Sequence, residues 1–271
     1  MDTSPIKFGL SLLFVEGDLT KELCQTLVEA GVNNLELDAS CLHSEGNLTG
    51  FSMMLRLQKL YPRTLHARFA KADDFSQLDE KGYLGAISTG IEAVNIAVGL
   101  GTEIIVMHPS VPPVLPNERA RRRQRSLNCL AEVGHAAGVN GVRIAIENLP
   151  GANLGNEIDE LDWFIDRLGD ETYGVCLDVN HLDDRYAELP DIVRSLGPRL
   201  IAMHISDYDG IEEKHWKPGK GVVDWPGLMK ALAEIHYNGP FTFECSGDGE
   251  DLSAKMTDLS ATYQWLYGLA Q

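Results

Sequence analysis

The segments VRIAIE at residues 142–147, YGVCLD at 173–178, LIAMHI at 200–205 and FTFEC at 241–245 share one design. Alternate residues of a β-strand point to opposite faces, so each segment has a bulky apolar row on one face. The other face carries a small residue followed, two places on, by a side chain that can bind a metal ion. These four side chains are Glu147, Asp178, His204 and Glu244. Strands lying side by side would bring them together at one edge.

Similar strand-length runs recur along the whole chain and alternate with amphipathic stretches of helical length. The predicted strands are residues 6–13, 33–38, 64–69, 104–108, 142–147, 173–178, 200–205 and 241–245. The predicted helices include residues 19–30, 85–99, 118–137, 157–168, 187–196 and 225–235. Eight strands alternating with helices over 271 residues predict a (β/α)8 TIM barrel. Because no linker or repeat interrupts the pattern, we expect a single domain spanning residues 1–271.

The charge of the chain restricts its partners. The 23 Lys and Arg against 40 Asp and Glu give a formal net charge of −17. Proteins that bind nucleic acid or anionic membranes carry basic surface, so we expect neither partner. The sequence has no secretory-type N-terminus and no run of about 18 apolar residues. The 5 Cys lie far apart without a CxxC motif, which favours reduced thiols and a cytoplasmic protein.

The four repeated side chains predict a metal site. Adjacent parallel strands lie about 4.8 Å apart, so four consecutive strand ends can converge on one ion. Three carboxylates and one imidazole form a mainly oxygen site that suits one divalent cation, Mn²⁺ first, with Mg²⁺, Co²⁺ or Zn²⁺ also suitable. Any one of these residues alone could equally be a loop cap or a surface charge. Four of them in register on matching faces favour the metal site.

Five segments of this chain resemble the xylose-isomerase-like barrels, and they occur in the same order. They are IAIENLPG, VCLDVNH, IAMHISD, HWKPGKGVVDW and FTFECSG. That group includes sugar-phosphate isomerases and epimerases, ketose 3-epimerases, hydroxypyruvate isomerase, inosose dehydratase and the endonuclease IV type of DNA-repair enzyme. The resemblance implies a homo-oligomer, with His181 as a substrate-contacting histidine and the four repeated side chains as metal ligands.

The resemblance also implies a reaction. A divalent ion would bind the carbonyl and a neighbouring hydroxyl of a small sugar or polyol and stabilise an enediolate. Glu147 and Glu244 would form an acid/base pair on opposite faces of the sugar, one removing the proton as general base and the other returning it as general acid. Return of the proton to the same carbon is epimerisation, and return to the adjacent carbon is isomerisation. The sequence leaves this choice open.

Further polar residues fall near the expected strand ends. His66 and His108 end the third and fourth strands, and in the DNA-repair branch histidines at these places hold a second metal. By the same comparison His181, Glu213 and His215 could form a third site, although that branch has Asp where this chain has Glu213. We favour the simpler interpretation that His66, His108 and His215 bind substrate. Glu36, on the inner face of the second strand, binds substrate or supports another pocket group.

Three other functions remain open. A lyase would use the same metal and base to expel a hydroxyl from a keto-polyol, as inosose or dehydroshikimate dehydratases do. An abasic-site endonuclease is suggested by the histidines and opposed by the charge, and a non-catalytic binding barrel is opposed by the intact ligand set. Lys217 and Lys220 in KPGKG, like Arg68 and Arg185, are candidates for a substrate anion. A loop of solvated lysines fits the first two equally well.

Overall fold

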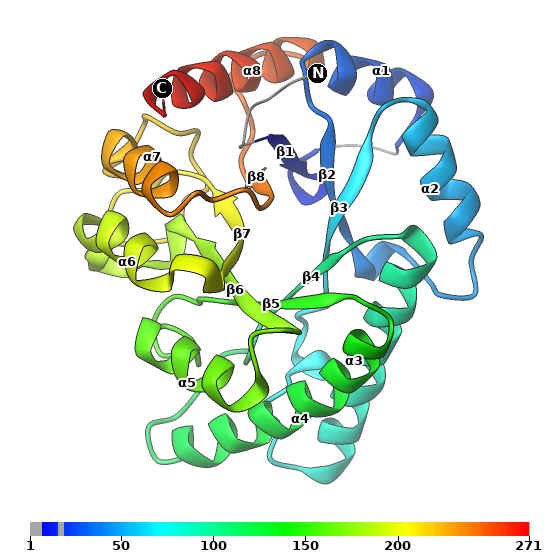
Figure 1. The fold of residues 1–271 in the computed structure, drawn as a ribbon, viewed down its shortest axis with the longest axis vertical. Coiled ribbons are helices and arrows are strands. Elements are labelled where there is room, and N and C mark those ends of the chain that lie inside the picture. The colour runs from blue at the N-terminus through cyan, green and yellow to red at the C-terminus, as the bar shows by residue number, and fades with distance from the viewer. Residues whose placement is uncertain (1–6, 16–18, 271) are drawn as a thin grey trace.

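The computed structural model describes residues 7–15 and 19–270 and shows a closed barrel of parallel strands surrounded by helices (Figure 1). The strands are β1 (Phe8–Ser11), β2 (Asn34–Asp38), β3 (Tyr61–His66), β4 (Ile104–Met107), β5 (Arg143–Glu147), β6 (Tyr173–Asp178), β7 (Leu200–Ile205) and β8 (Phe241–Phe243). The helices are α1 (Lys21–Glu29), α2 (Leu48–Leu57), α3 (Glu80–Leu100), α4 (Arg119–Val139), α5 (Ile158–Leu168), α6 (Leu189–Leu196), α7 (Trp225–Glu234) and α8 (Leu252–Leu269). Each strand pairs with its neighbours in sequence, and β1 pairs with β8. The predicted (β/α)8 barrel is therefore confirmed.

Most strand boundaries lie close to the predicted ones, and β6 and β7 match them fully. The largest difference is at β3, which begins at Tyr61 instead of residue 64 and ends at His66 instead of residue 69. Pro62 lacks an N–H group and argues against a strand when the sequence is considered alone. In the barrel, however, the Tyr61 amide donates to the Asn33 carbonyl and brings this segment into the sheet. Residue 6, the predicted start of the first strand, lies outside the described residues.

One side chain faces a different way from its prediction. Strict alternation would place Ile201 on the apolar face of β7 with Met203, opposite His204, but it packs with Ala145, Cys176 and Ala202 in a small cluster inside the barrel. The cause is a shift in register between β6 and β7, where Val175 pairs with Leu200 and Cys176 pairs with Ala202. A bulge of this kind leaves one residue unpaired and turns its side chain. The alternation resumes afterwards, so His204 still faces inward opposite Asp178.

The helices start where side chains satisfy their first backbone amides. Thr20 accepts a hydrogen bond from the Leu23 amide at the start of α1, and Asp224 and Asp251 cap α7 and α8 in the same way. Each such cap contributes about 1 kcal/mol to stability. At the other end of α3, Gly101 adopts a left-handed conformation with φ of 65°, which a glycine takes without a steric penalty. These local interactions thus define where the helices begin and end.

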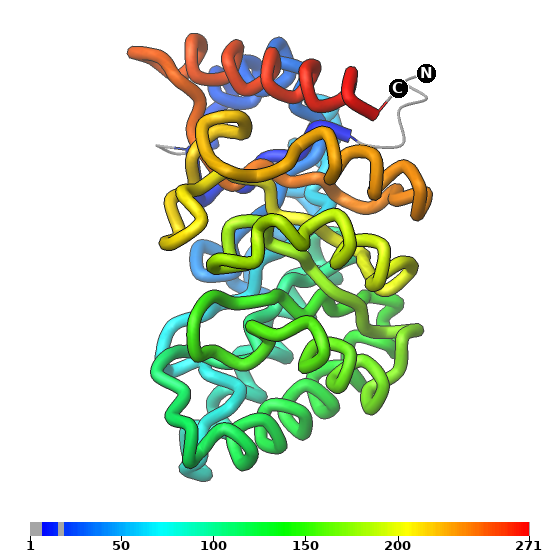
Figure 2. Tube along the Cα trace, turned by 90° about the vertical axis from the view of Figure 1, so that its left-hand side faces the viewer, coloured from blue at the N-terminus to red at the C-terminus, as the bar shows by residue number. Residues whose placement is uncertain are grey.

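The two ends of the described chain close the ring. Helix α8 lies against α1 and over the first strands (Figure 2). Phe8 of β1 stacks on Tyr263 of α8 with ring centroids 4.9 Å apart, and it meets Phe243 of β8 edge-on. Aromatic contacts of this type add to the burial of apolar area. The last strand and helix are therefore part of the same core as the first.

The basic run at residues 119–125 forms the start of α4 and is tied to neighbouring elements. Its ion pairs are Arg119 and Arg123 with Glu160, Arg122 with Asp74 and Arg125 with Glu80. Arg122 is buried and also donates to the Ser76 hydroxyl and the Val111 carbonyl. From the sequence alone, a dense basic run at the start of a helix predicts a solvated face or a subunit contact. Arg122 differs from that prediction because a buried carboxylate, Asp74, is available to pair with it.

By length and composition, α3 is the one helix of the described residues that could cross a membrane. In this fold α3 packs between α2 and α4 and against β3 and β4. One face of α3, including Val94 and Ala97, is fully buried in the core, whereas Leu84, Ile91 and Val98 are exposed. The place of this helix between the barrel and its neighbours therefore explains part of its apolar character.

Candidate active site

The four repeated side chains converge at the carboxyl-terminal mouth of the barrel. Glu147 ends β5, Asp178 ends β6, His204 is near the end of β7 and Glu244 directly follows β8. The Nδ1 atom of His204 lies 3.1 Å from Glu147 Oε1 and 3.4 Å from Glu244 Oε2. One ligand atom each from Glu147, Asp178 and His204 lies within 4.8 Å of the others. The structure thus brings together all four residues that the strand pattern singled out.

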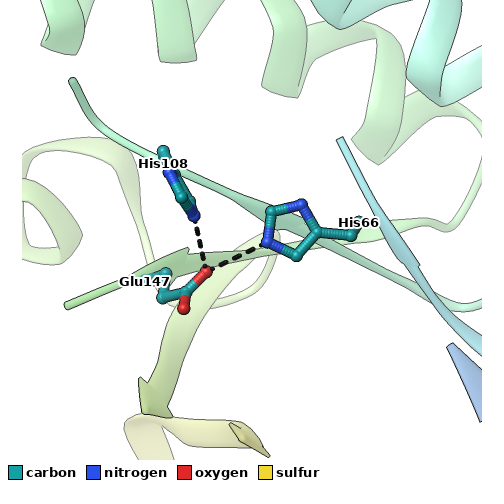
Figure 3. Close-up of side chains that lie close together, drawn as sticks. All are labelled: His66, His108 and Glu147. Atoms are coloured by element: carbon teal, nitrogen blue, oxygen red, sulfur yellow. Dashed lines mark hydrogen bonds and ion pairs between the residues drawn. The ribbon is translucent and has the colours of Figure 1, made fainter. Parts of the chain in front are cut away.

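Two more predicted site residues, His66 and His108, meet the other oxygen of Glu147 (Figure 3). His66 Nε2 lies 3.3 Å and His108 Nε2 3.0 Å from Glu147 Oε2. The Nδ1 atom of His66 lies 2.8 Å from the Ala67 carbonyl, to which it donates when Nδ1 is protonated. Because β3, β4 and β5 are neighbours, their ends place both imidazoles beside the same carboxylate. Glu147 is therefore the centre of the polar cluster.

A third group lies on the β6 and β7 side of the mouth. His181 Nδ1 lies 3.4 Å from Asp178 Oδ2 and its Nε2 lies 3.6 Å from Glu213 Oε2. His215 Nε2 lies 2.6 Å from Glu213 Oε1, and its Nδ1 lies 2.9 Å from the Glu244 carbonyl. Glu213 thus bridges the two histidines that the sequence proposed as substrate contacts. The loop after β7 brings Glu213 and His215 to the site.

Glu36 occupies a different place from the other predicted substrate contacts. Its Oε2 atom lies 3.1 Å from His204 Nε2, and both side chains are only 1% exposed. Glu36 is absent from the walls of the cavity described below, whereas His66, His108, His181 and His215 line it. The structure therefore places Glu36 behind His204, on the side away from Glu147.

Asn148 is a structural partner of the site that the sequence analysis did not single out. Its side-chain nitrogen donates to the Asp178 carbonyl at 2.9 Å, and its side-chain oxygen accepts from the Asp178 amide at 2.7 Å. Its own carbonyl lies 2.9 Å from His181 Nδ1. These bonds clamp the ends of β5 and β6 together. The signal available in the sequence was an amide side chain directly after Glu147 at a strand end.

Burial and close charges shift the pKa values of this cluster. Burial alone would lower the pKa of His66, but the hydrogen bond and charge of Glu147 raise it to about 9. Burial raises the pKa of Glu244 to about 8, against the effect of His204 and with that of Glu36. Burial opposes ionisation of Glu147, yet the charges of His204 and His108 hold its pKa well below the usual range. Imidazolium and carboxylate groups thus neutralise one another in this buried cluster.

The donor atoms of the cluster fit a divalent cation. Asp178 is fully buried, and its Oδ2 atom accepts no hydrogen bond from any described residue, the nearest imidazole nitrogen being 3.4 Å away. A buried carboxylate oxygen without a partner is costly unless something positive satisfies it. Carboxylate oxygens with one imidazole nitrogen are a donor set that Mn²⁺ and Mg²⁺ accept, and Zn²⁺ or Co²⁺ tolerate. The residues present therefore suit the ion that the sequence predicted.

A cavity of about 270 Å³ opens over the cluster. Its polar wall contains the carboxylates of Glu147, Glu213 and Glu244 and the four histidines, and its apolar wall is formed by Leu13, Phe14, Phe69, Val111, Pro112, Leu149 and Pro150. The side-chain oxygen of Asn153, also in the wall, is buried and has no hydrogen-bond partner among the described residues. An apolar cavity with a few convergent polar groups is the usual form of a small-molecule site.

Comparisons with known proteins agree with this fold. A family model described as Xylose isomerase-like TIM barrel matches residues 61–268. The uncharacterised protein MJ1311 of Methanocaldococcus jannaschii is 25% identical over 247 residues, covering 88% of this chain and 83% of that protein. A D-psicose 3-epimerase of Enterocloster bolteae is 27% identical over 130 residues, which cover 47% of this chain and 42% of that enzyme. A crystal structure of D-psicose 3-epimerase in the presence of D-fructose shares the fold, with a TM-score of 0.85, 18% identity, and coverage of 98% of this chain and 99% of that one.

Proposed function

Because this chain belongs to the xylose isomerase-like TIM barrel family, we propose that it is a divalent-metal-dependent epimerase or isomerase of a small sugar. The observation that carries this proposal is the placement of two carboxylates in one cavity. Glu147 from β5 and Glu244 after β8 both line the cavity and both approach His204 Nδ1. Two acid/base groups on different strands can address two faces of one bound substrate. The epimerase names of the similar proteins support the same reaction class.

Each residue then has a task. Glu147, Asp178, His204 and Glu244 would hold the cation, which when bound polarises a carbonyl and an adjacent hydroxyl. Glu147 takes the proton from the carbon between these groups. Glu244 returns a proton to the same carbon in an epimerisation, or to the neighbouring carbon in an isomerisation.

The histidines assist without taking that proton. His66 and His108, both against Glu147 Oε2, hold this carboxylate in place. His181 and His215 line the cavity and are in reach of substrate oxygens. The Glu147 and Glu244 side chains are at most 7% exposed, so little water competes for the proton in transit.

The proposal extends to the compartment and to the assembly. The cysteines are free thiols, as a reducing cytoplasm favours, and we place the enzyme there. A homo-oligomer remains part of the proposal and is tested by light scattering. The substrate partner is a small sugar or polyol, with no nucleic acid and no membrane.

Product analysis tests the reaction. Protein stripped with a chelator and reloaded with Mn²⁺ is incubated with a panel of ketoses and aldoses in H₂O and in D₂O. An epimerase or isomerase leaves the product mass unchanged in H₂O and introduces solvent deuterium at the reacting carbon in D₂O. Loss of one water would instead identify the dehydratase alternative. Turnover that survives complete removal of metal would contradict the metal-dependent mechanism, and Glu234→Gln, a substitution on the outer face of α7, serves as the active control.

A further inference from the structure

We propose that the substrate is uncharged: a free hydroxyketone or hydroxyaldehyde, and not a phosphate ester or a carboxylate. This inference rests on the proposed function and names its substrate class. Four observations support it, concerning the cavity wall, the histidines, the loops after β7 and β8, and the basic residues nearest the mouth.

The cavity wall contains no Lys or Arg. All 23 of these residues lie in the described part of the chain, and none is among the lining residues. Three carboxylates, Glu147, Glu213 and Glu244, face the same space. Three carboxylates among the proposed ligands also outweigh the charge of one divalent ion. A substrate anion would therefore enter a cavity that offers no unpaired positive side chain and would remain without a counter-charge, which is strongly unfavourable.

The histidines of the wall do not supply the missing charge. His66 and His108 both lie within 3.3 Å of Glu147. His181 lies between Asp178 and Glu213, and His215 is 2.6 Å from Glu213. An imidazolium in contact with a carboxylate is already neutralised. These groups can donate to hydroxyl and carbonyl oxygens, but they do not form a cationic pocket.

The corner where barrels commonly hold a phosphate is occupied by the protein's own carboxylates. That position is formed by the loops after the seventh and eighth strands. Here the Gly219 amide donates to Asp207 Oδ2 at 2.9 Å, and the Asp248 amide donates to Asp258 Oδ2 at 2.7 Å. Lys217 Nζ lies 2.7 Å from Asp258, and Lys220 pairs with Asp248. The lysines that the sequence offered for a substrate anion are thus engaged within the protein.

The remaining basic candidates also point elsewhere. Arg68 lies in a separate hollow beyond Phe69, where Asp38 and Asp73 share the wall. Arg185 pairs with Glu157 at 2.9 Å. The apolar wall of the main cavity instead suits the C–H face of a sugar. The unpartnered oxygen of Asn153 can accept a hydrogen bond from a neutral hydroxyl.

Matched pairs of substrates test this inference. Each ketose of the panel, for example D-fructose, is compared with its terminal phosphate on the Mn²⁺-loaded enzyme. We expect kcat/KM to favour the free sugar by about 100-fold or more, since a buried phosphate lacks a counter-charge. Equal or better turnover of the phosphate would overturn the inference while leaving the proposed function intact. If no member of any pair reacts, the proposed function fails. Calorimetry of the binding of the same pairs then still tests the substrate class. Tighter binding of the phosphate than of the free sugar would contradict the inference that the substrate is uncharged.

A designed cation provides the converse test. Val111 lines the cavity, and Val111→Arg adds a guanidinium to a wall that has none. We expect the preference for the free sugar to fall by about tenfold in this variant. Val111→Gln, of comparable length and without charge, is the matched control and should leave the preference unchanged. If Arg and Gln change the ratio equally, bulk and not charge controls the selection.

An independent observation concerns Glu36, and the geometry points to a positioning role for it behind His204. The two ring nitrogens of an imidazole point to opposite edges, so one ion can be bound by only one of them. Glu147 and Glu244 gather at the Nδ1 edge. Glu36 faces Nε2 at 3.1 Å, although its oxygen also lies within 4.8 Å of a Glu244 oxygen. Glu36 therefore holds the proton on Nε2 and leaves Nδ1 to face the ion, without being a ligand itself.

Measurements of metal affinity distinguish a positioning role of Glu36 from a role as a metal ligand. Glu36→Gln keeps an acceptor for the Nε2 proton, so its affinity for Zn²⁺, measured by competition with a fluorescent chelator, should stay within about threefold of wild type. Glu36→Leu removes the acceptor and should weaken affinity about 10-fold to 100-fold. If Leu prevents folding, as judged by thermal unfolding of the metal-free protein, Glu36→Ala replaces it. A loss in Glu36→Gln as large as that in Glu147→Gln would show that Glu36 is a ligand. Unchanged affinity in the Leu or Ala variant would show that it has no role.

Discussion

Glu147 and Glu244 have the same side chain but different neighbours. Four histidines, His66, His108, His181 and His204, lie within 3.5 Å of Glu147. Glu244 is approached by His204 alone among the ion pairs of the described residues. Loss of the Glu147 charge would leave four buried imidazoles without their common partner, which damages the site as a whole. Glu244 is therefore the better position at which to test the acid/base assignment.

We expect Glu244→Gln to lower the rate of product formation by about 10²-fold to 10⁴-fold, the usual contribution of a general acid or base. Glu244 is also a proposed ligand, so metal content is measured alongside and rates are compared per bound ion. Because Glu147 remains, molecules of this variant that hold the ion should still exchange the reacting hydrogen of the substrate with solvent, which NMR in D₂O measures. The comparison is Asp178→Asn, which removes a proposed ligand and keeps both acid/base groups. There exchange and product formation should fall together with metal content. Product formation by Glu244→Gln within threefold of wild type would exclude the two-base mechanism.

Some residues of the site could be predicted from the sequence, whereas the partners of others depend on the fold. The alternation within strands identified Glu147, Asp178, His204 and Glu244, because side-chain direction in a strand follows directly from position. For Glu36 the sequence left two roles open, substrate binding or support of another pocket group, since nothing in the sequence tells which nitrogen of His204 a distant carboxylate will meet. Lys217 and Lys220 were left open for a similar reason. Their partners Asp248 and Asp258 lie beyond the next strand and become neighbours only in the fold.

Helix α4 shows how packing can overrule helix propensity. A Cβ atom added at Gly134 would lie 1.5 Å from the Tyr173 hydroxyl oxygen of β6. That hydroxyl donates to the Leu130 carbonyl one turn earlier in α4 at 2.6 Å. The glycine therefore allows strand and helix to approach closely, and the tyrosine fixes their spacing. Propensity alone would favour alanine at this position.

Paired substitutions test this explanation. Gly134→Ala should reduce the free energy of unfolding by about 1–3 kcal/mol, the usual cost of overpacking. Gly85→Ala in α3 is the control, because nothing lies within 4 Å of a Cβ there. The control should gain up to about 1 kcal/mol from helix propensity. Urea unfolding of both variants measures the difference, and equal effects would refute the role assigned to Tyr173.

At the scale of the whole molecule, the sequence predicted the barrel but not its local irregularities. Eight strand-length runs alternating with helices left few alternatives at this chain length. The early start of β3 and the inward turn of Ile201 depend on register shifts between neighbouring strands. Such shifts arise from closing the sheet into a cylinder, which constrains all strands at once. A pattern that is read one segment at a time does not contain that information.

The stability of the metal-free protein should depend on pH in a definite direction. The pKa of His66 is raised from 6.5 to about 9, so its contribution to stability is fully present below pH 6.5 and is lost as the pH rises through 9. The pKa of Glu244 is raised from 4.5 to about 8. The folded chain therefore keeps a proton that the unfolded chain releases above pH 4.5, and stability again falls as the pH rises. Urea unfolding in a chelator should show a lower free energy at pH 9 than at pH 6.5.

Saturating Mg²⁺ should reduce the loss of unfolding free energy between pH 6.5 and pH 9, because a bound cation favours the deprotonated forms of its ligands. The variant His66→Asn isolates the share that belongs to the imidazole. A metal-free profile that is flat or rises between pH 6.5 and pH 9 would contradict the proposed charge balance of the cluster.

The pairing of β1 with β8 has a consequence for synthesis of the chain. A ribosome completes β1 long before β8, so the nascent protein holds an open sheet whose first and last edges lack each other. Glu244 emerges with the final strand, so the growing chain lacks one proposed ligand until the sheet can close. Full metal affinity would then arise only after β8 has been made. A tightly bound ion would therefore distinguish chains whose barrel is closed from shorter chains that lack β8.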